Sequence, residues 1–163
     1  ETLLEKYDIL FVNGGSSKGD MDLTAEAVSR LGEVIVHGVA IKPGKPTIIG
    51  RVNKKLVMGL PGYPVSMFFA VKELFLKAFF NAYNLNPKQK TIWALLERRL
   101  FSDMGAEEYI RVSIENDQGR NLARVLKRGA SVISSLKRAD GYIVIPVNAD
   151  LLEEGSLVEV KLI

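Results

Sequence analysis

The sequence predicts an α/β domain followed by a small all-β domain, because the spacing of apolar residues changes along the chain. In residues 1–84, short apolar runs alternate with helical patterns, which is typical of a mainly parallel sheet with helices. In residues 91–163 the apolar period falls to about two, and turn residues separate the runs, which predicts a β-barrel or sandwich. Residues 85–90 are polar, contain a proline and are expected to form the linker.

The first strand is predicted at residues 8–12, a continuous apolar run of the kind that is buried on both faces of a parallel sheet. A short helix follows from about Leu23 to Leu31, and Gly32 is a natural C-terminal stop. The remaining elements are a strand, a hairpin and a long helix, expected at 33–41, at 47–52 with 56–60, and at 65–83. These elements are too few to cover both faces of a buried strand, so we expect either a second chain or a longer protein.

The second domain is predicted as a series of short strands with period-two patterning. Turn residues such as Asp117-Gln118-Gly119 and Glu154-Gly155 separate them. The expected strands lie at 92–100, 108–114, 122–126, 141–146 and 157–162.

Composition excludes several classes of function. The 163 residues contain no cysteine, which rules out disulfides, a thiol nucleophile and a cysteine metal site, and fits a reducing, cytoplasmic compartment. The single histidine, His37, follows β-branched residues and is expected to be a sheet residue rather than a ligand. No apolar run approaches the roughly 20 residues that span a bilayer. The formal charge of +3 is spread along the chain and the strands lack interleaved aromatics, so we expect no nucleic-acid partner.

The loop AIKPGKP at residues 40–46 is the strongest candidate for chemistry. It holds two ammonium groups, Lys42 and Lys45, on a short segment restrained by Pro43 and Pro46. Gly44 permits a turn between them. Two cations held close together repel each other, and a multiply charged oxyanion between them would relieve that repulsion. The alternative is a solvated basic turn.

A second candidate is the loop NGGSSKGDMD at residues 13–22, which follows a strand and precedes a helix. Glycines at this position let backbone N–H groups approach a phosphate at the start of the helix. Serine hydroxyls and Lys18 would add to such a site, whereas Asp20 and Asp22 would repel an anion. One aspartate is expected to cap the helix, and the other to hold a divalent metal or to orient a hydroxyl or water. The alternative is an ordinary β–α turn.

A third candidate is GLPGYPVS at residues 59–66, with Pro64 at the first position of the long helix. Exposed N–H groups of Val65, Ser66 and Met67 would form an anion site there, although a well-made helix start is the alternative. If the preceding strands are parallel neighbours, the three loops meet at one edge of the sheet. They would then bind one ligand that carries a phosphate and a second oxyanion.

Weaker candidates lie in the second domain. Arg111 could face an anion, although a surface salt bridge with Glu107 or Glu108 is the more ordinary use. Three serines before an apolar strand are expected to be turn residues, namely Ser131, Ser134 and Ser135.

Five motifs resemble those of the molybdopterin molybdenumtransferase family, which contains MoeA and the E domain of gephyrin. The family pattern runs roughly as TSGGVSVGxxD, AIKPGKP, GLPGNPVS, EFxR and LSSLxxADGLIxLP. Here the order is VNGGSSKGDMD, AIKPGKP, GLPGYPVS, EYIR and ISSLKRADGYIVIP. The match covers most of residues 8–80 and 107–163. Departures include Asn13, Lys18 and Tyr63, of which Tyr63 narrows or reshapes the third loop.

The resemblance implies the last step of molybdenum cofactor biosynthesis. In that step molybdate is inserted into adenylylated molybdopterin, and AMP is released with help from Mg²⁺. Residues 1–84 would be the C-terminal part of a molybdopterin-binding α/β domain, and residues 91–163 a C-terminal β-barrel domain. The resemblance further implies a homodimer whose neighbouring subunit completes the site, and the molybdopterin adenylyltransferase as a partner. The chain alone is expected to be inactive. A non-catalytic scaffold with vestigial anion loops is the rival interpretation.

The resemblance also implies roles for individual residues. Catalytic roles fall on Asp22, Lys42 and Lys45. Contacts to molybdopterin and phosphate fall on Gly14, Gly15, Ser16, Ser17, Gly19, Pro61, Gly62 and Pro64. Molybdate would be held by Lys42, Lys45, Pro46, Ser66, Arg111 and Ser134. Magnesium would be held by Asp20 and Asp22.

Overall fold

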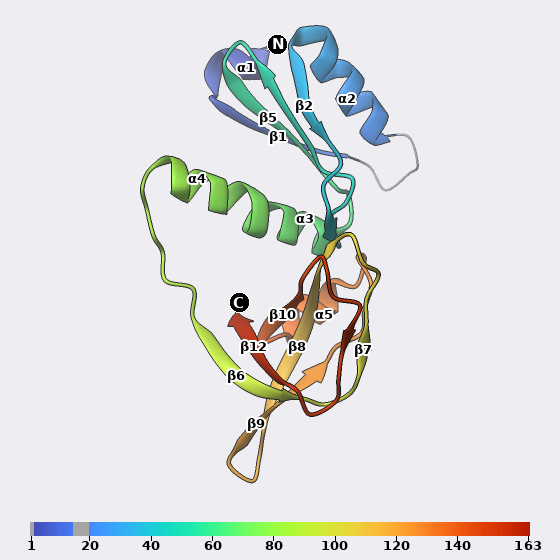
Figure 1. The fold of residues 1–163 in the computed structure, drawn as a ribbon. Coiled ribbons are helices and arrows are strands. Elements are labelled where there is room, and N and C mark those ends of the chain that lie inside the picture. The colour runs from blue at the N-terminus through green and yellow to red at the C-terminus, as the bar shows by residue number, and fades with distance from the viewer. Residues whose placement is uncertain (1, 15–19) are drawn as a thin grey trace.

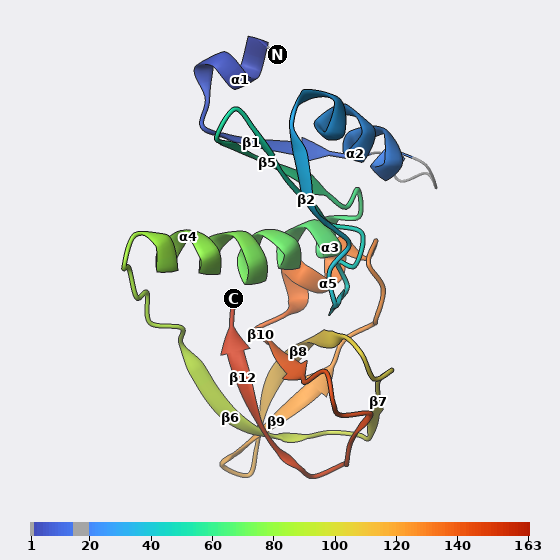
Figure 2. The same cartoon turned by 45° about the horizontal axis from the view of Figure 1, so that its top comes forward.

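The computed structural model describes residues 2–14 and 20–163, with residues 2 and 20–22 described by their backbone alone. A small sheet with two helices lies at one end of the molecule and a β-barrel at the other (Figure 1). A long helix that begins at α3 crosses between them, and the same arrangement is seen in the second view (Figure 2).

The first sheet has four strands in the order β1-β5-β4-β2. Only β1 and β5 are parallel, while β5 pairs antiparallel with β4 and β4 antiparallel with β2. The expected mainly parallel sheet is therefore wrong, and the sheet is mixed. The reason is local, since the turn between β4 and β5 is too short for the crossover that parallel neighbours require. The strands are Ile9–Asn13 (β1), Glu33–His37 (β2), Ile48–Val52 (β4) and Lys55–Leu60 (β5).

The β4–β5 turn consists of Asn53 and Lys54, whose φ angles are 49° and 68°. Two consecutive positive φ values match the right-handed twist of a two-residue hairpin. The predicted hairpin is thus confirmed, with Val52 and Lys55 as the last paired residues.

Helix α2 (Asp20–Leu31) packs on the strands of this sheet, and α1 (Thr2–Lys6) precedes β1. Val28 of α2 is buried with Val52 and Val57. Gly50 permits this close packing, because a Cβ there would lie 2.4 Å from Val28 Cγ1. The helix was predicted, with a start three residues too late.

Strand β1 was expected to be buried on both faces, and within this chain it is not. It lies at the edge of the sheet, and none of its five residues is fully buried. Phe11 is 41% exposed and makes an edge-on contact with Phe75, with 4.8 Å between the ring centroids.

The long helix begins at Pro64, as predicted, and runs to Ala82. Its middle six residues are π-helical, so that it divides into α3 (Pro64–Phe69), η1 (Ala70–Phe75) and α4 (Leu76–Ala82). The π-helical segment contains the buried Glu73, which accepts a short hydrogen bond from the Tyr142 hydroxyl in the barrel. Lys77 lies 2.6 Å from the other Glu73 oxygen.

Five strands close into a barrel in the order β10-β12-β6-β9-β8, and β8 pairs back to β10. Of the two predicted architectures, a barrel and a sandwich, the closed sheet is a barrel. Alternating side chains such as Leu96, Val112 and Ile143 fill its interior. The strands are Thr91–Leu96 (β6), Glu107–Asp117 (β8), Arg120–Val125 (β9), Gly141–Ile145 (β10) and Leu157–Leu162 (β12).

Two elements of this half differ from the prediction. A small pair of strands, β7 (Leu100–Phe101) and β11 (Leu151–Leu152), lies beside the barrel. The serines expected in a turn fall partly in a short helix, α5 (Ile133–Arg138), which contains Ser134 and Ser135.

The strand expected at 33–41 divides into β2 and a separate two-residue strand, β3 (Ile41–Lys42). Strand β3 leaves the first sheet and pairs parallel with β8, matching Ile41 with Glu107 and Lys42 with Glu108. The Phe69 ring also stacks on Tyr109 of β8, with 4.9 Å between centroids. Backbone pairing and aromatic packing therefore join the two halves of the chain.

Candidate anion-binding site

A cavity of about 1010 Å³ lies where the two halves meet. Its wall is built from the β2–β4 connection, the start of α3, and the segments of the barrel around β8 and residue 128. Seven polar or charged side chains among those that line it are Lys42, Lys45, Ser66, Asp103, Glu108, Arg111 and Arg128.

The AIKPGKP loop forms one side of the cavity, and both of its lysines line it. Pairing of β3 with β8 anchors the start of the loop. Gly44 adopts a φ of +131°, and a Cβ at this position would meet Ile41 Cδ1 at 2.6 Å. The Thr47 hydroxyl donates to the Gly44 carbonyl at 2.7 Å, which closes the loop. The predicted turn at Gly44 is confirmed.

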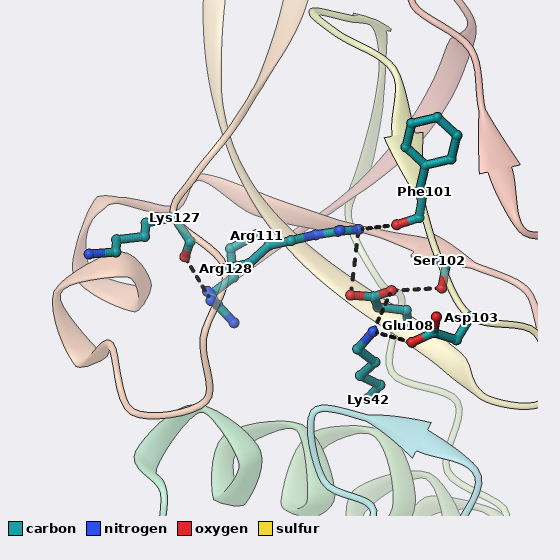
Figure 3. A network of polar contacts seen from close by, with 8 residues as sticks. All are labelled: Lys42, Phe101, Ser102, Asp103, Glu108, Arg111, Lys127 and Arg128. Carbon is teal, nitrogen blue, oxygen red and sulfur yellow. Dashed lines mark hydrogen bonds and ion pairs between the residues drawn. The ribbon is translucent and has the colours of Figure 1, made fainter.

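Two carboxylates of the barrel half face Lys42, and their negative charges offset its repulsion of Lys45. Lys42 Nζ lies 3.1 Å from Asp103 Oδ2 and 3.5 Å from Glu108 Oε2 (Figure 3). No carboxylate in the described part of the chain pairs with Lys45, which is exposed and lines the cavity beside Pro46.

Glu108 is the centre of a polar network that the sequence did not suggest (Figure 3). Its side chain is only 6% exposed. The Ser102 hydroxyl donates to Glu108 Oε2 at 2.6 Å, and Arg128 Nη2 lies 3.5 Å from Oε1. Arg128 also donates to the Phe101 carbonyl at 2.9 Å. Lys42 and Arg128 are remote from Glu108 in sequence, and only the β3–β8 register brings Lys42 beside it.

Arg111 lies on β8 and is 4% exposed. Its Nη2 donates to the carbonyls of Lys127 and Gly129, each at 3.1 Å, while the buried Nε has no hydrogen-bond partner among the described residues. Burial lowers the pKa of Arg111, because desolvation disfavours the charged form. The guanidinium nevertheless remains charged at neutral pH, since the pKa of arginine starts far above it.

The surface salt bridge considered for Arg111 is wrong. Glu107 instead accepts a short hydrogen bond from the Tyr109 hydroxyl, and Glu108 faces Lys42 and Arg128. Arg111 is thus a buried cation of the cavity wall without a carboxylate partner in the described chain.

The start of α3 contributes Ser66, which is 4% exposed and lines the cavity together with Pro61 and Tyr63. Three backbone N–H groups were expected to be exposed here, and two of them are instead hydrogen-bonded. Val65 N donates to the Ala130 carbonyl at 3.1 Å, and Met67 N donates to the Tyr63 carbonyl at 2.9 Å. Gly62 and Pro64 flank the cavity in sequence but do not line it.

The segment 127–130 connects Arg111 to the helix. Its carbonyls at 127 and 129 accept from Arg111, its carbonyl at 130 accepts from Val65, and its Arg128 side chain reaches Glu108. This segment therefore holds the helix start and the barrel wall at a defined separation.

The diglycine loop begins beside the end of β5, because Gly14 N donates to the Leu60 carbonyl at 3.1 Å. Gly14 is buried and does not line the cavity. Gly15, Ser16, Ser17, Lys18 and Gly19 lie outside the described residues. The carboxylates of Asp20 and Asp22 are not described, although both residues belong to the first turn of α2.

Ser134 is the predicted molybdate residue that the structure keeps apart from the others. It is exposed on α5 and does not line the cavity. His37 is exposed at the end of β2 and does line it.

Comparison with known proteins identifies the chain. Residues 1–81 match the family model of a probable molybdopterin binding domain, and residues 94–163 match that of the MoeA C-terminal region, domain IV. The chain belongs to the MoeA family. The cavity of this MoeA-family chain lies where the two matched regions meet, with Lys42, Lys45 and Ser66 in the first and Arg111 in the second.

Relatives and solved structures agree with this assignment. A putative molybdopterin biosynthesis protein of Methanocaldococcus jannaschii is 40% identical over 164 residues, covering 100% of this chain and 38% of that protein. The molybdopterin molybdenumtransferase of Bacillus subtilis is 29% identical, covering 98% of this chain and 38% of that protein. The crystal structure of a molybdopterin biosynthesis MoeA protein from Pyrococcus horikoshii superposes with a TM-score of 0.79 at 37% identity, covering 99% and 38% of the two chains. The MoeA-family chain thus spans about 38% of the length of these relatives.

Proposed function

We propose that the full-length protein inserts molybdate into adenylylated molybdopterin and releases AMP, as a molybdopterin molybdenumtransferase. The observation that carries this proposal is the lining of one cavity by Lys42, Lys45, Ser66 and Arg111, which come from three separate segments. Two ammonium groups, a guanidinium and a hydroxyl supply both the charge and the hydrogen-bond donors that a tetrahedral dianion requires.

Each of these residues has a distinct proposed role. Lys45 is exposed and has no carboxylate partner among the described residues. It could therefore bind an anion without first breaking an ion pair. Arg111 lines the cavity as a buried cation, and its positive charge would attract the anion. Ser66 offers a hydroxyl at the base of α3, and Pro46 supports the loop.

The same cations would serve the chemistry of AMP release. Cleavage of the phosphoanhydride bond develops negative charge on phosphate oxygens, and fixed cations in a poorly solvated cavity stabilise that charge. We assign this role to Lys42 and Lys45. The loop that begins at Gly14 would bind the phosphate of the pterin through its glycine and serine residues, and Asp22 would orient the reacting group. Ser134 remains a predicted molybdate ligand that would have to reach the anion from α5.

Magnesium does not fit the described residues. In residues 2–14 and 20–163, with the side chains of Asp20 and Asp22 outside the description, no group of three potential metal ligands occurs. The carboxylates that do line the cavity, Asp103 and Glu108, are paired with Lys42. We therefore derive no step through the ion.

The remaining proposals concern organisation. We propose a division into an α/β part at 1–84, a linker at 85–90 and the barrel at 91–163. We also propose a homodimer that works in the cytoplasm with an adenylyltransferase as its supplier, and inactivity of this chain by itself. Within the described residues, no helix combines the length and apolar character needed to span a membrane.

The proposal is tested by mixing the full-length protein with adenylylated molybdopterin and following AMP by chromatography, with and without molybdate. Release that depends on molybdate supports the transferase. If AMP is not released and molybdate does not raise the melting temperature, the protein is the non-catalytic scaffold.

A further inference from the structure

Glu108 lies in the wall of the cavity, where its buried negative charge is paired with Lys42 and Arg128. We propose that Glu108, assisted by Asp103, is a specificity-determining residue that sets the charge of the cavity to match a tetrahedral dianion. This inference rests on the proposed function, because it assumes that the cavity binds an oxyanion.

The charges that line the cavity support this role. Among the residues whose side chains the structure describes, four cations line it, Lys42, Lys45, Arg111 and Arg128, and two carboxylates line it, Asp103 and Glu108. These six side chains give a formal sum of +2, from four positive and two negative charges, which is equal and opposite to the charge of molybdate. Without Glu108 the same described side chains would sum to +3, and the cavity would favour anions of higher charge more strongly.

Glu108 is expected to affect a bound anion more strongly than Asp103 does, because Glu108 is buried. The Glu108 side chain is 6% exposed, whereas that of Asp103 is 92% exposed. Water and salt screen an exposed charge, but a buried charge acts on a neighbouring anion through a medium of lower dielectric constant. Asp103 is therefore expected to contribute in the same direction but to a smaller extent.

A purely structural role for Glu108 is the alternative. Its two ion pairs are both 3.5 Å long, and the partners Lys42 and Arg128 are 47% and 40% exposed. Pairs with such exposed partners contribute little. The electrostatic effect of Glu108 on a bound anion should thus be larger than its effect on the positions of Lys42 and Arg128.

The binding of two tetrahedral oxyanions of similar shape distinguishes a role of Glu108 in setting the cavity charge from a purely structural role. Molybdate carries two negative charges and perrhenate carries one, so an effect of charge on molybdate should be twice as large in free energy. Both are titrated calorimetrically into the unmodified full-length protein and its Glu108→Gln and Glu115→Gln variants. Glu115 is the matched control, because it lies on the same strand and pairs with Arg124 at 2.8 Å on the surface.

We expect Glu108→Gln to bind molybdate about tenfold more tightly and perrhenate about threefold more tightly. Glu115→Gln should change neither by more than about twofold. If Glu108→Gln alters both anions by the same factor, or weakens both, Glu108 is a structural residue and the inference is wrong. If the unmodified protein does not bind molybdate, the proposed function fails, and the inference fails with it.

Asp103→Asn provides a second test that does not depend on the folding of the Glu108 variant, because Asp103 is on the surface. It should strengthen molybdate binding more than perrhenate binding, by a smaller factor than Glu108→Gln. An equal change for the two anions would contradict the role of carboxylate charge in the cavity.

Discussion

Lys42 and Glu108 are register partners across the junction of the two halves of the chain. Strand β3 pairs parallel with β8 at this position, and Lys42 Nζ lies 3.5 Å from Glu108 Oε2. The backbone pairing brings a cation of the AIKPGKP loop to the barrel, where Arg111 forms another part of the same cavity. A two-residue strand thus assembles a site from segments about 65 residues apart.

Replacement of Arg111 by lysine should impair both binding and stability. Lysine lacks the planar fork with which the Arg111 guanidinium donates to the carbonyls of Lys127 and Gly129 while it lines the cavity. We expect molybdate affinity to fall about tenfold and the free energy of unfolding to fall by about 1–3 kcal/mol. Calorimetry and urea unfolding measure the two effects. Arg124→Lys, at an exposed ion pair on β9, is the control and should leave both quantities nearly unchanged. Equal behaviour of the two variants would contradict the buried role of Arg111.

The Glu73 carboxylate should make stability depend on pH. Burial by itself raises the pKa of Glu73, but hydrogen bonds from Lys77 and Tyr142 and the charges of Lys77 and Lys161 outweigh it and lower the pKa below its ordinary value of 4.5. A carboxylate with a lowered folded-state pKa stabilises the fold above its unfolded-state pKa, and this stabilisation is lost as the pH falls through the folded-state pKa. We expect unfolding free energies measured in urea to fall more steeply below about pH 4.5 in the unmodified protein than in Glu73→Gln. Parallel curves for the two proteins would refute this contribution.

Lys54→Gly should stabilise the protein. Lys54 has a φ of 68° in the β4–β5 turn, which costs a lysine free energy but suits glycine, and Asn-Gly is the preferred pair for this turn. We expect a gain of about 0.5–1 kcal/mol in the free energy of unfolding. The neighbouring Lys55→Gly is the control, and it should destabilise because Lys55 is paired in β5. A loss of stability in Lys54→Gly would show that the turn does not carry the expected strain.

Gly44→Ala should damage the cation loop. A Cβ at position 44 would lie 2.6 Å from Ile41 Cδ1, and the φ of +131° is unfavourable for alanine. We expect a loss of about 1–3 kcal/mol in stability together with weaker molybdate binding. Gly119→Ala tests the effect of positive φ alone, since nothing lies within 4 Å of a Cβ there. If the two variants lose equal stability and both bind molybdate normally, the close contact at Ile41 is unimportant.

Local patterns in the sequence predicted much of the fold. The hairpin turn, the start of the long helix at Pro64 and most strands of the barrel each follow from short-range rules of turn chemistry and apolar period. The first sheet was mispredicted as mainly parallel, although the predicted hairpin at 47–52 and 56–60 already required an antiparallel pair; only β1 and β5 are parallel. The π-helical segment was also missed, because its buried Glu73 depends in part on a hydrogen bond from Tyr142 in the distant barrel.

The candidate site was predictable in part, because two of its carboxylates and one of its cations were missed. Lys42, Lys45 and Ser66 lie in distinctive sequence motifs, whereas Asp103, Glu108 and Arg128 lie in ordinary charged stretches. Their place in the cavity depends on β3 joining the barrel, a long-range pairing of two residues that no local pattern indicates. The helix start was overestimated as an anion site, because Ala130 supplies an acceptor for Val65 from a distant segment.

The most direct test of the central claim is a calorimetric titration of molybdate into the full-length protein and its Lys45→Ala variant. Lys45 is exposed, so its removal should change the free energy of unfolding by no more than about 0.5 kcal/mol. Lys88→Ala, an exposed lysine far from the cavity in sequence, controls for the loss of one surface charge. The account predicts that Lys45→Ala folds normally and no longer binds molybdate, while Lys88→Ala binds as the unmodified protein does. Undiminished molybdate affinity in Lys45→Ala would contradict it.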